Sequence, residues 1–282
     1  MDKTIIDDFI KNALTEDVGD GDHTSLSTIP KGTRGKAKLL IKDEGILAGV
    51  ELAQEICRIV DESLQLEIFL NDGVEINPGD IAFTIEGSVH SILKAERLVL
   101  NCMQRMSGIA TKTHEITQLL EGTGTKLLDT RKTTPGMRYL EKWAVKIGGG
   151  VNHRFGLYDM ILIKDNHVDY SGGIANAINN AKDYLAETGK NLQIEIEVRN
   201  LDELEEVFQT GGVNRILLDN FKPDVLQQAV AMNKGRFITE ASGGITIDNI
   251  RDYANCGVDY ISVGALTHSV KSLDMSLKAV KA

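Results

Sequence analysis

The feature that most constrains the fold is a repeat of short apolar segments that begins after Gly124. Amphipathic stretches of helical period separate most of these segments. Such an alternation predicts βα units and a mostly parallel sheet. The strand candidates are Lys126–Leu128, Met160–Ile163, Gln193–Ile196, Arg215–Leu218, Phe237–Thr239 and Tyr260–Val263.

These six units are two short of a complete eight-stranded barrel, so the pattern favours an α/β fold with an open, incomplete barrel. A doubly wound sheet is the competing architecture. It is less favoured because no GxGxxG motif follows any of the strands.

Residues 1–110 have a different pattern, in which short strands and helices are mixed. From Ser91 to Leu120 apolar residues recur at helical spacing, and we expect two helices that break near Ser107-Gly108. The acidic stretch from Glu16 to Asp22 lacks the spacing of a calcium loop and is interpreted as a turn with helix caps. The other predicted elements are strands at Lys36–Ile41 and Ile81–Ile85 and a helix at Val50–Val60.

The charge balance limits the possible partners. A net charge of -10 and a pI near 5.2 argue against a nucleic-acid-binding surface. No apolar run is long enough to span a bilayer, and the acidic first residues lack a signal-peptide core, so we expect a cytoplasmic protein without a membrane partner. Cys57, Cys102 and Cys256 lack CxxC spacing, which indicates reduced thiols rather than a zinc or disulfide framework.

Polar residues follow nearly every predicted strand of the repeat. Because ligands bind at the carboxyl ends of strands in βα barrels, these residues are the candidate site. They are Asp129-Thr130-Arg131-Lys132, Lys164-Asp165-Asn166-His167, Glu195 and Glu197, Asp219-Asn220, Glu240-Ala241-Ser242-Gly243-Gly244, and Ser262-Val263-Gly264.

A basic set within this acidic protein indicates an anionic ligand. Between Leu127 and His167 there are 7 Lys and Arg residues against 4 Asp and Glu residues. Forked guanidinium groups suit carboxylates and phosphates, whereas lysine acts as a point charge. The basic set consists of Arg131, Lys132, His153, Arg154 and Lys164.

Two further groups have open interpretations. The carboxylates of Glu197 and Asp219 suit Mg²⁺ bridged through phosphates or sugar hydroxyls, or they are buried partners of nearby lysines. The loops Ser242-Gly243-Gly244 and Ser262-Val263-Gly264 suit a phosphate group bound by backbone N–H groups, or they are plain βα turns.

Several motifs together resemble one family of enzymes. They are "LLDTRKTTPGMRYLEKWAVKIGGGVNHRFGLYDMILIKDNH", "AERLVLNCMQRMSGIAT", "IEIEV", "RILLDN", "EASGGI" and "GVDYISVGALTHS", and they extend over nearly the whole chain. This set resembles the quinolinate phosphoribosyltransferases, the carboxylating nicotinate-nucleotide pyrophosphorylases of NAD synthesis.

The resemblance implies a fold and an assembly. It implies an N-terminal α/β sandwich domain at residues 1–110, an open α/β barrel catalytic domain at 111–270, and a C-terminal helix at 271–282 that packs back on the N-terminal domain. It also implies a homodimer whose active sites are shared between subunits, and it allows a hexamer of such dimers.

The resemblance also implies an activity and roles for residues. The expected reaction transfers phosphoribosyl from phosphoribosyl pyrophosphate to quinolinate with loss of CO₂, which gives nicotinate mononucleotide and pyrophosphate. Arg131, His153, Arg154 and Lys164 would bind quinolinate, and Arg97 would come from the partner subunit. Lys132, Glu197 and Asp219 would hold phosphoribosyl pyrophosphate and its Mg²⁺, together with Ser242, Gly243, Gly244, Ser262, Val263 and Gly264.

Four other functions stay open at this point. One is a related transferase that uses nicotinate, and another is a paralogue of the same fold linked to molybdate uptake. A third is a barrel aldolase with Lys164 as a Schiff-base amine, and the last is a non-enzymatic anion-binding protein. The number of forked cations favours a dicarboxylate ligand and therefore quinolinate.

Overall fold

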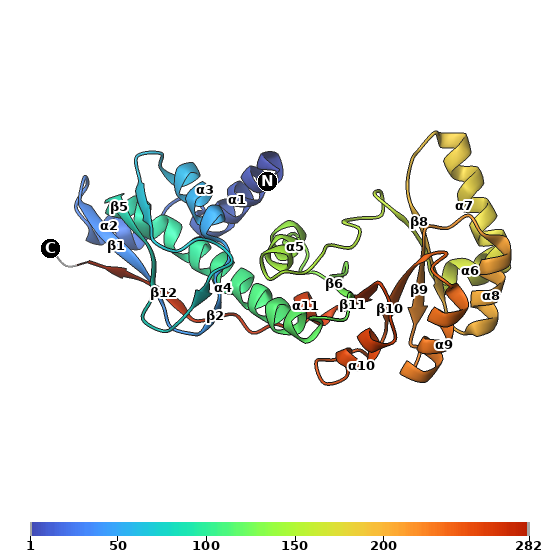
Figure 1. The fold of residues 1–282 in the computed structure, drawn as a ribbon. Helices are drawn as coiled ribbons and strands as arrows, with labels where there is room; N and C mark the ends of the chain where they lie inside the picture. The colour runs from blue at the N-terminus through green and yellow to red at the C-terminus, as the bar shows by residue number, and fades with distance from the viewer. Residues whose placement is uncertain (1, 281–282) are drawn as a thin grey trace. The chain divides into compact units, whose positions relative to one another are not determined.

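The computed structural model describes residues 2–280. The chain divides into two compact units, whose elements are labelled in Figure 1. Unit 1 contains the chain up to His114, the segment Thr133–Gly149 and the chain from Thr267 on, and unit 2 contains Glu115–Lys132 and Gly150–Leu266. No helix within the described range is long and apolar enough to cross a membrane.

Unit 2 is built on a parallel sheet of six strands with the order β6-β11-β10-β9-β8-β7. The described residues form no ladder between the edge strands β6 and β7, so the barrel is open, and the six predicted strands are confirmed. The strands are β6 (Lys126–Leu128), β7 (Ile161–Ile163), β8 (Ile194–Val198), β9 (Arg215–Asp219), β10 (Ile238–Ser242) and β11 (Tyr260–Ser262).

Helices follow the strands of unit 2, as a βα repeat requires. The Asn200 side chain accepts a hydrogen bond from the Glu203 N–H and starts α8, and Pro223 occupies the first turn of α9. Leu204 and Val207 of α8 are buried. The helices are α6 (Asp165–Ser171), α7 (Ile174–Thr188), α8 (Leu201–Thr210), α9 (Pro223–Asn233) and α10 (Ile250–Asn255), and α11 (Ala265–His268) begins at the end of the unit.

Unit 1 contains an antiparallel sheet with the order β12-β1-β5-β3 and a small second sheet of β2 and β4. Its strands are β1 (Arg34–Ile41), β2 (Gly45–Ile46), β3 (Gln65–Ile68), β4 (Glu75–Ile76), β5 (Ile81–Ser88) and β12 (Met275–Ala279). Its helices are α1 (Lys3–Val18), α2 (His23–Thr28), α3 (Val50–Val60), α5 (Arg138–Ile147) and most of α4 (Val89–Leu119).

The turn between α1 and α2 confirms the interpretation of the acidic stretch. Gly19 ends α1 and has a positive φ of 53°. The Asp22 side chain accepts a hydrogen bond from the Ser25 N–H at 3.0 Å, which caps α2.

The predicted break near Ser107-Gly108 is wrong, because α4 is one helix of 31 residues. The buried Ser107 hydroxyl accepts a hydrogen bond from the Ala48 N–H at 2.9 Å and donates one to the Ala48 carbonyl at 3.2 Å. A Cβ at position 108 would lie 2.2 Å from the carbonyl oxygen of Lys271. The small residues therefore allow close packing against the helix and do not end it.

The C-terminal helix expected at 271–282 is also wrong over the residues that the structure describes. Met275–Ala279 forms β12, which pairs antiparallel with β1 from Ile41↔Met275 to Ala37↔Ala279 (Figure 1). The pairing supplies hydrogen-bond partners to the edge of β1 that β5 leaves open. Residues 281 and 282 lie outside the described range.

The division of the chain also differs from the expected ranges at one internal segment. Thr133–Gly149, which carries α5, belongs to unit 1, although it lies within the expected barrel range 111–270. The Arg105 Nη2 lies 2.9 Å from Glu141 Oε1, and Glu141 Oε2 accepts a hydrogen bond from the Thr134 N–H at 3.1 Å. These contacts join the segment to α4 within unit 1.

Candidate active site

One face of the parallel sheet carries polar side chains at alternate positions of three strands. Because side chains two residues apart in a strand lie on the same face, Glu195 and Glu197 of β8 lie together. The same holds for Arg215 and Asp219 of β9, and for Glu240 and Ser242 of β10. The sequence positions at the carboxyl ends of these strands are therefore brought to one edge of the sheet, as predicted.

Lys164 stands at the junction of β7 and α6. Its N–H donates a hydrogen bond to His167 Nδ1 at 3.0 Å, which fixes the start of the helix. Its Nζ lies 3.3 Å from Glu197 Oε2, and the Lys164 side chain is 49% exposed while that of Glu197 is 8% exposed. This cation therefore reaches solvent at the edge of the sheet while it is held by a buried carboxylate.

Asp219 ends β9 close to two lysines. Burial raises the pKa of Asp219, against the effects of a hydrogen bond from Asn220 and of the Lys164 and Lys132 charges. The hydrogen bond is 2.5 Å long and runs from Asn220 Nδ2 to Asp219 Oδ2. Asn220 has a positive φ of 57°, and its N–H donates to the Ser242 carbonyl at 2.8 Å. The chain is thus turned sharply where Asp219 is presented.

Gly243 follows β10 at a point where no side chain fits. A Cβ there would lie 2.3 Å from Asn220 Oδ1 and 2.9 Å from the Asn220 backbone nitrogen, and the φ of Gly243 is 91°. The next residue, Gly244, also has a positive φ, of 65°, and a Cβ there would meet nothing within 4 Å. The loop therefore has open space beside it, as an anion-binding loop requires.

Two guanidinium groups lie near each other at the same end of the sheet. Burial and the charge of Arg131 lower the pKa of Arg154. The Arg154 Nη1 donates a hydrogen bond to the Met160 carbonyl at 3.3 Å. The charges of Glu195 and Asp159 act in the opposite direction and partly offset this repulsion, and a ligand with carboxylate or phosphate groups would offset it further.

The loop Ser262-Val263-Gly264 after β11 was expected to offer backbone N–H groups to a phosphate, but part of it is already hydrogen-bonded within the protein. The Ser262 side chain is hydrogen-bonded to Glu240, and the Val263 N–H donates to the Leu128 carbonyl at 3.0 Å. These groups hold β11 in the sheet, so they are engaged by the protein itself.

The family model "Quinolinate phosphoribosyl transferase, C-terminal domain" matches residues 109–278, and the N-terminal domain model of the same family matches residues 22–107. The chain belongs to the quinolinate phosphoribosyltransferase family.

Individual members of the quinolinate phosphoribosyltransferase family are similar over nearly the whole chain. A tobacco quinolinate phosphoribosyltransferase [decarboxylating] is 45% identical over 95% of this chain and 81% of its own length. A probable nicotinate-nucleotide pyrophosphorylase [carboxylating] of Bacillus subtilis is 41% identical over 95% of this chain and 91% of its own length. The crystal structure of NadC from Streptococcus pyogenes has a TM-score of 0.93 at 37% identity, and the match covers 100% of this chain and 99% of that one.

Sequence reasoning named His153, Glu195 and Glu240 separately, but it missed Arg215 and the cluster that these four residues form. Glu195 and Glu240 are fully buried, and Arg215 and His153 lie between them. Burial and the Glu240 carboxylate raise the pKa of Glu195. Charged residues inside otherwise apolar strands were the available signal, because such residues are rarely buried without partners.

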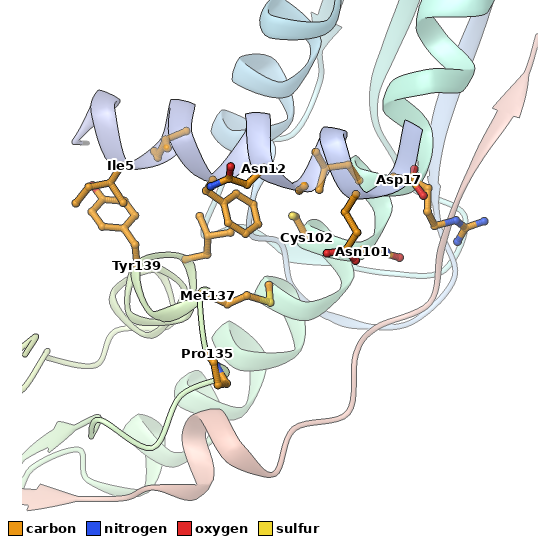
Figure 2. Close-up of a pocket in the computed structure, with 16 residues that line it drawn as sticks. Ile5, Asn12, Asp17, Asn101, Cys102, Pro135, Met137 and Tyr139 are labelled. Carbon is orange, nitrogen blue, oxygen red and sulfur yellow. The ribbon is translucent and has the colours of Figure 1, made fainter. Parts of the chain in front are cut away.

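Arg97, which the resemblance assigns to a shared active site, belongs to unit 1. It lies on α4 and lines a cavity of about 560 Å³ formed by α1, α4 and the start of α5. Figure 2 shows Asn12 and Asp17 on one side of this cavity and Asn101, Met137 and Tyr139 on the other. The Arg97 side chain is exposed, so a ligand can reach its guanidinium group.

Proposed function

We propose that the polar groups at the carboxyl edge of the unit 2 sheet form the active site of a quinolinate phosphoribosyltransferase. The reaction transfers phosphoribosyl from phosphoribosyl pyrophosphate to quinolinate and releases pyrophosphate and CO₂, and its product, nicotinate mononucleotide, enters NAD synthesis. The observation that carries the proposal is the gathering of Arg131, Arg154 and Lys164 with Glu197 and Asp219 at one sheet edge.

The basic groups have the chemistry that a pyridine dicarboxylate requires. Arg131 and Arg154 offer forked donors to its two carboxylates, and Lys164 offers a point charge beside them. The pyridine nitrogen is itself the nucleophile, so the protein needs no serine or cysteine nucleophile. Positioning of the two substrates supplies much of the rate acceleration.

Glu197 and Asp219 have the donor chemistry for Mg²⁺, which binds proteins through one or two carboxylates together with substrate phosphates. When bound, Mg²⁺ would neutralise charge on the pyrophosphate. Lys132 lies close enough to act on Asp219 and would stabilise the departing pyrophosphate, whose negative charge grows in the transition state. The carboxylates favour the positive charge that develops on the ribose.

The loops Ser242-Gly243-Gly244 and Ser262-Val263-Gly264 would hold the 5-phosphate of the ribose. The open space beside Gly244 supports this role for the first loop. The Val263 N–H already donates to the Leu128 carbonyl, so the second loop has fewer backbone donors for the phosphate.

The proposed assembly is a homodimer in which Arg97 of the partner subunit completes each site. The exposed guanidinium of Arg97 beside a cavity in unit 1 supports a role in binding. A hexamer of such dimers is compatible with the same pairing.

We also propose a cytoplasmic location. Relatives from plants are named as chloroplastic or mitochondrial, so the location is not a shared property of the family. Fractionation of cells that express the native chain would test it, and recovery in an organelle fraction would contradict it.

The activity is tested with the purified chain, quinolinate, phosphoribosyl pyrophosphate and Mg²⁺. We expect nicotinate mononucleotide and CO₂ in equal amounts, and we expect chelation of Mg²⁺ to stop turnover. Faster turnover of nicotinate with no CO₂ from quinolinate would contradict the proposed substrate. Trapping of Lys164 by borohydride with a carbonyl substrate would indicate an aldolase instead.

A further inference from the structure

A buried charge cluster lies in the sheet of unit 2, and the proposed reaction gives it no role. The cluster consists of His153, Glu195, Arg215 and Glu240. The Glu195 and Glu240 side chains are 0% exposed, that of His153 is 7% exposed and that of Arg215 is 12% exposed. Groups buried to this degree need partners, because unpaired charge in a protein interior is strongly destabilising.

The cluster supplies its own partners. The His153 Nε2 lies 3.0 Å from Glu195 Oε2 and 3.4 Å from Glu240 Oε2. The Arg215 Nη1 lies 3.1 Å from Glu240 Oε2, and its Nε lies 3.9 Å from Glu195 Oε1. Arg215 also stacks over the Tyr260 ring, 4.6 Å from its centroid. Each carboxylate therefore faces both basic groups.

The same histidine and carboxylates lie within 4.8 Å of one another, which is the spacing of metal ligands. Arg215 argues against a metal ion here, because its guanidinium already supplies positive charge to Glu240. Arg215 and His153 thus supply the two carboxylates with positive charge that a metal ion would otherwise bring.

His153 connects this network to the edge of the sheet. Its ring Nδ1 accepts a hydrogen bond from the Arg154 backbone N–H at 2.7 Å, and the backbone N–H of His153 donates to Asp129 Oδ1 at 2.8 Å. Because Nδ1 accepts this bond, Nε2 carries a ring proton and faces the carboxylates. Burial lowers the pKa of His153, but the hydrogen bonds and charges of Glu195 and Glu240 raise it to about 9, and the Arg154 N–H opposes the second proton on Nδ1 that this value favours. Both ring nitrogens of His153 are thus engaged by the protein.

We propose that Glu195, Glu240 and Arg215 are positioning residues that act through His153 to orient Arg154 toward quinolinate. His153 itself is then a support for Arg154 and makes no contact with quinolinate. This inference rests on the proposed function, since it concerns how that site holds its dicarboxylate.

A double-mutant cycle between Glu240→Gln and Arg154→Ala tests the proposal on the assembled enzyme. Glu240→Gln keeps the shape of the side chain and removes its charge. If the cluster orients Arg154 toward quinolinate, Glu240→Gln should raise the KM for quinolinate about tenfold and leave the KM for phosphoribosyl pyrophosphate within about twofold. Residues that act through the same contact show non-additive effects. In the Arg154→Ala background the same substitution should change kcat/KM for quinolinate by less than about twofold.

The matched control is Glu205→Gln on the exposed face of α8 in the same unit, which should be neutral in both backgrounds. If Glu240→Gln changed kcat/KM for quinolinate by the same factor in the wild-type and Arg154→Ala backgrounds, the proposal would be overturned. If the wild-type chain failed to turn over quinolinate, the proposed function would fail instead, and the two failures are therefore distinguishable.

A second measurement is made on the wild-type chain, with a variant used only to assign one signal, and it covers the case in which Glu240→Gln fails to fold. Nitrogen-15 NMR of the histidine rings reports which ring nitrogen carries the proton, and His153→Asn assigns the signal. We expect Nδ1 of His153 to stay unprotonated when quinolinate is added. A proton on Nδ1 in the complex would show that His153 donates to the substrate, and would overturn the proposal.

Discussion

At the scale of single residues, Gly243 is a position in the candidate site that has no room for a side chain. A methyl group there would meet Asn220 Oδ1 at 2.3 Å, and the positive φ adds backbone strain. We expect Gly243→Ala to lower kcat/KM for phosphoribosyl pyrophosphate by about tenfold or more, because a displacement of about 1 Å in a positioning loop can cost about a hundredfold. Steady-state kinetics with this substrate varied would measure the loss.

Gly235→Ala is the matched control for that substitution. Gly235 also has a positive φ, of 70°, but a Cβ there would meet nothing within 4 Å. It therefore reproduces the backbone strain without the clash. If both variants lost the same activity, the clash with Asn220 would have no part in the effect.

The thiols of Cys57 and Cys102 give a prediction about pH. Burial raises the pKa of each to about 12, whereas an exposed thiol in an unfolded chain has a pKa of about 8.5. Because the folded value is the higher one, the stability linked to these thiols is complete below about pH 8.5 and falls as the pH rises above it. We expect a thiol reagent at pH 8 to modify Cys57 and Cys102 only when urea is added, and rapid labelling of the folded protein would contradict this.

At the scale of elements, the packing of α4 depends on Gly108. Alanine normally stabilises a helix by about 1 kcal/mol relative to glycine. Here its Cβ would lie 2.2 Å from the Lys271 carbonyl oxygen, and overpacking of this kind costs about 1–3 kcal/mol. We expect the clash to prevail, so that Gly108→Ala lowers the free energy of unfolding, as measured by urea denaturation. Gln118→Ala at an exposed position of α4 is the control, and equal stability of the two variants would contradict the expectation.

The same elements show how far the sequence predicts this structure. The six strands of unit 2 were predictable because apolar runs followed by polar residues are local signals. The continuity of α4 was not, because Ser107 and Gly108 serve contacts with Ala48 and Lys271, which are distant in sequence. The strand β12 was missed for the same reason, since its partner β1 lies at the other end of the chain.

The candidate site, like the fold, was predictable from the sequence only in part. The positions that end strands were predicted from their place in the repeat, and Lys164 and Glu197 do form a pair. The surroundings of His153 could not be predicted, because its partners Glu195 and Glu240 come from two other strands that are not adjacent in the sheet.

At the scale of the whole molecule, the proposed sharing of active sites can be tested by mixing two inactive variants. Arg97→Ala and Lys164→Ala should each be inactive as homodimers. In a mixed dimer one site regains both wild-type residues, and the other site carries both defects. Random mixing makes about half of the dimers mixed, so roughly a quarter of all sites should recover activity after the chains are refolded together. Complete subunit exchange with no recovered turnover would show that Arg97 does not act across the dimer.

The pairing of β12 with β1 has a consequence for how the protein is made. The ribosome produces β1, β5 and β3 early, but β1 has no neighbour on one side until Met275–Ala279 is synthesised. In the meantime all the strands of unit 2 emerge, so that its sheet can form while that edge is still open to other nascent chains. The half of the molecule that is synthesised first is therefore the half that is finished last.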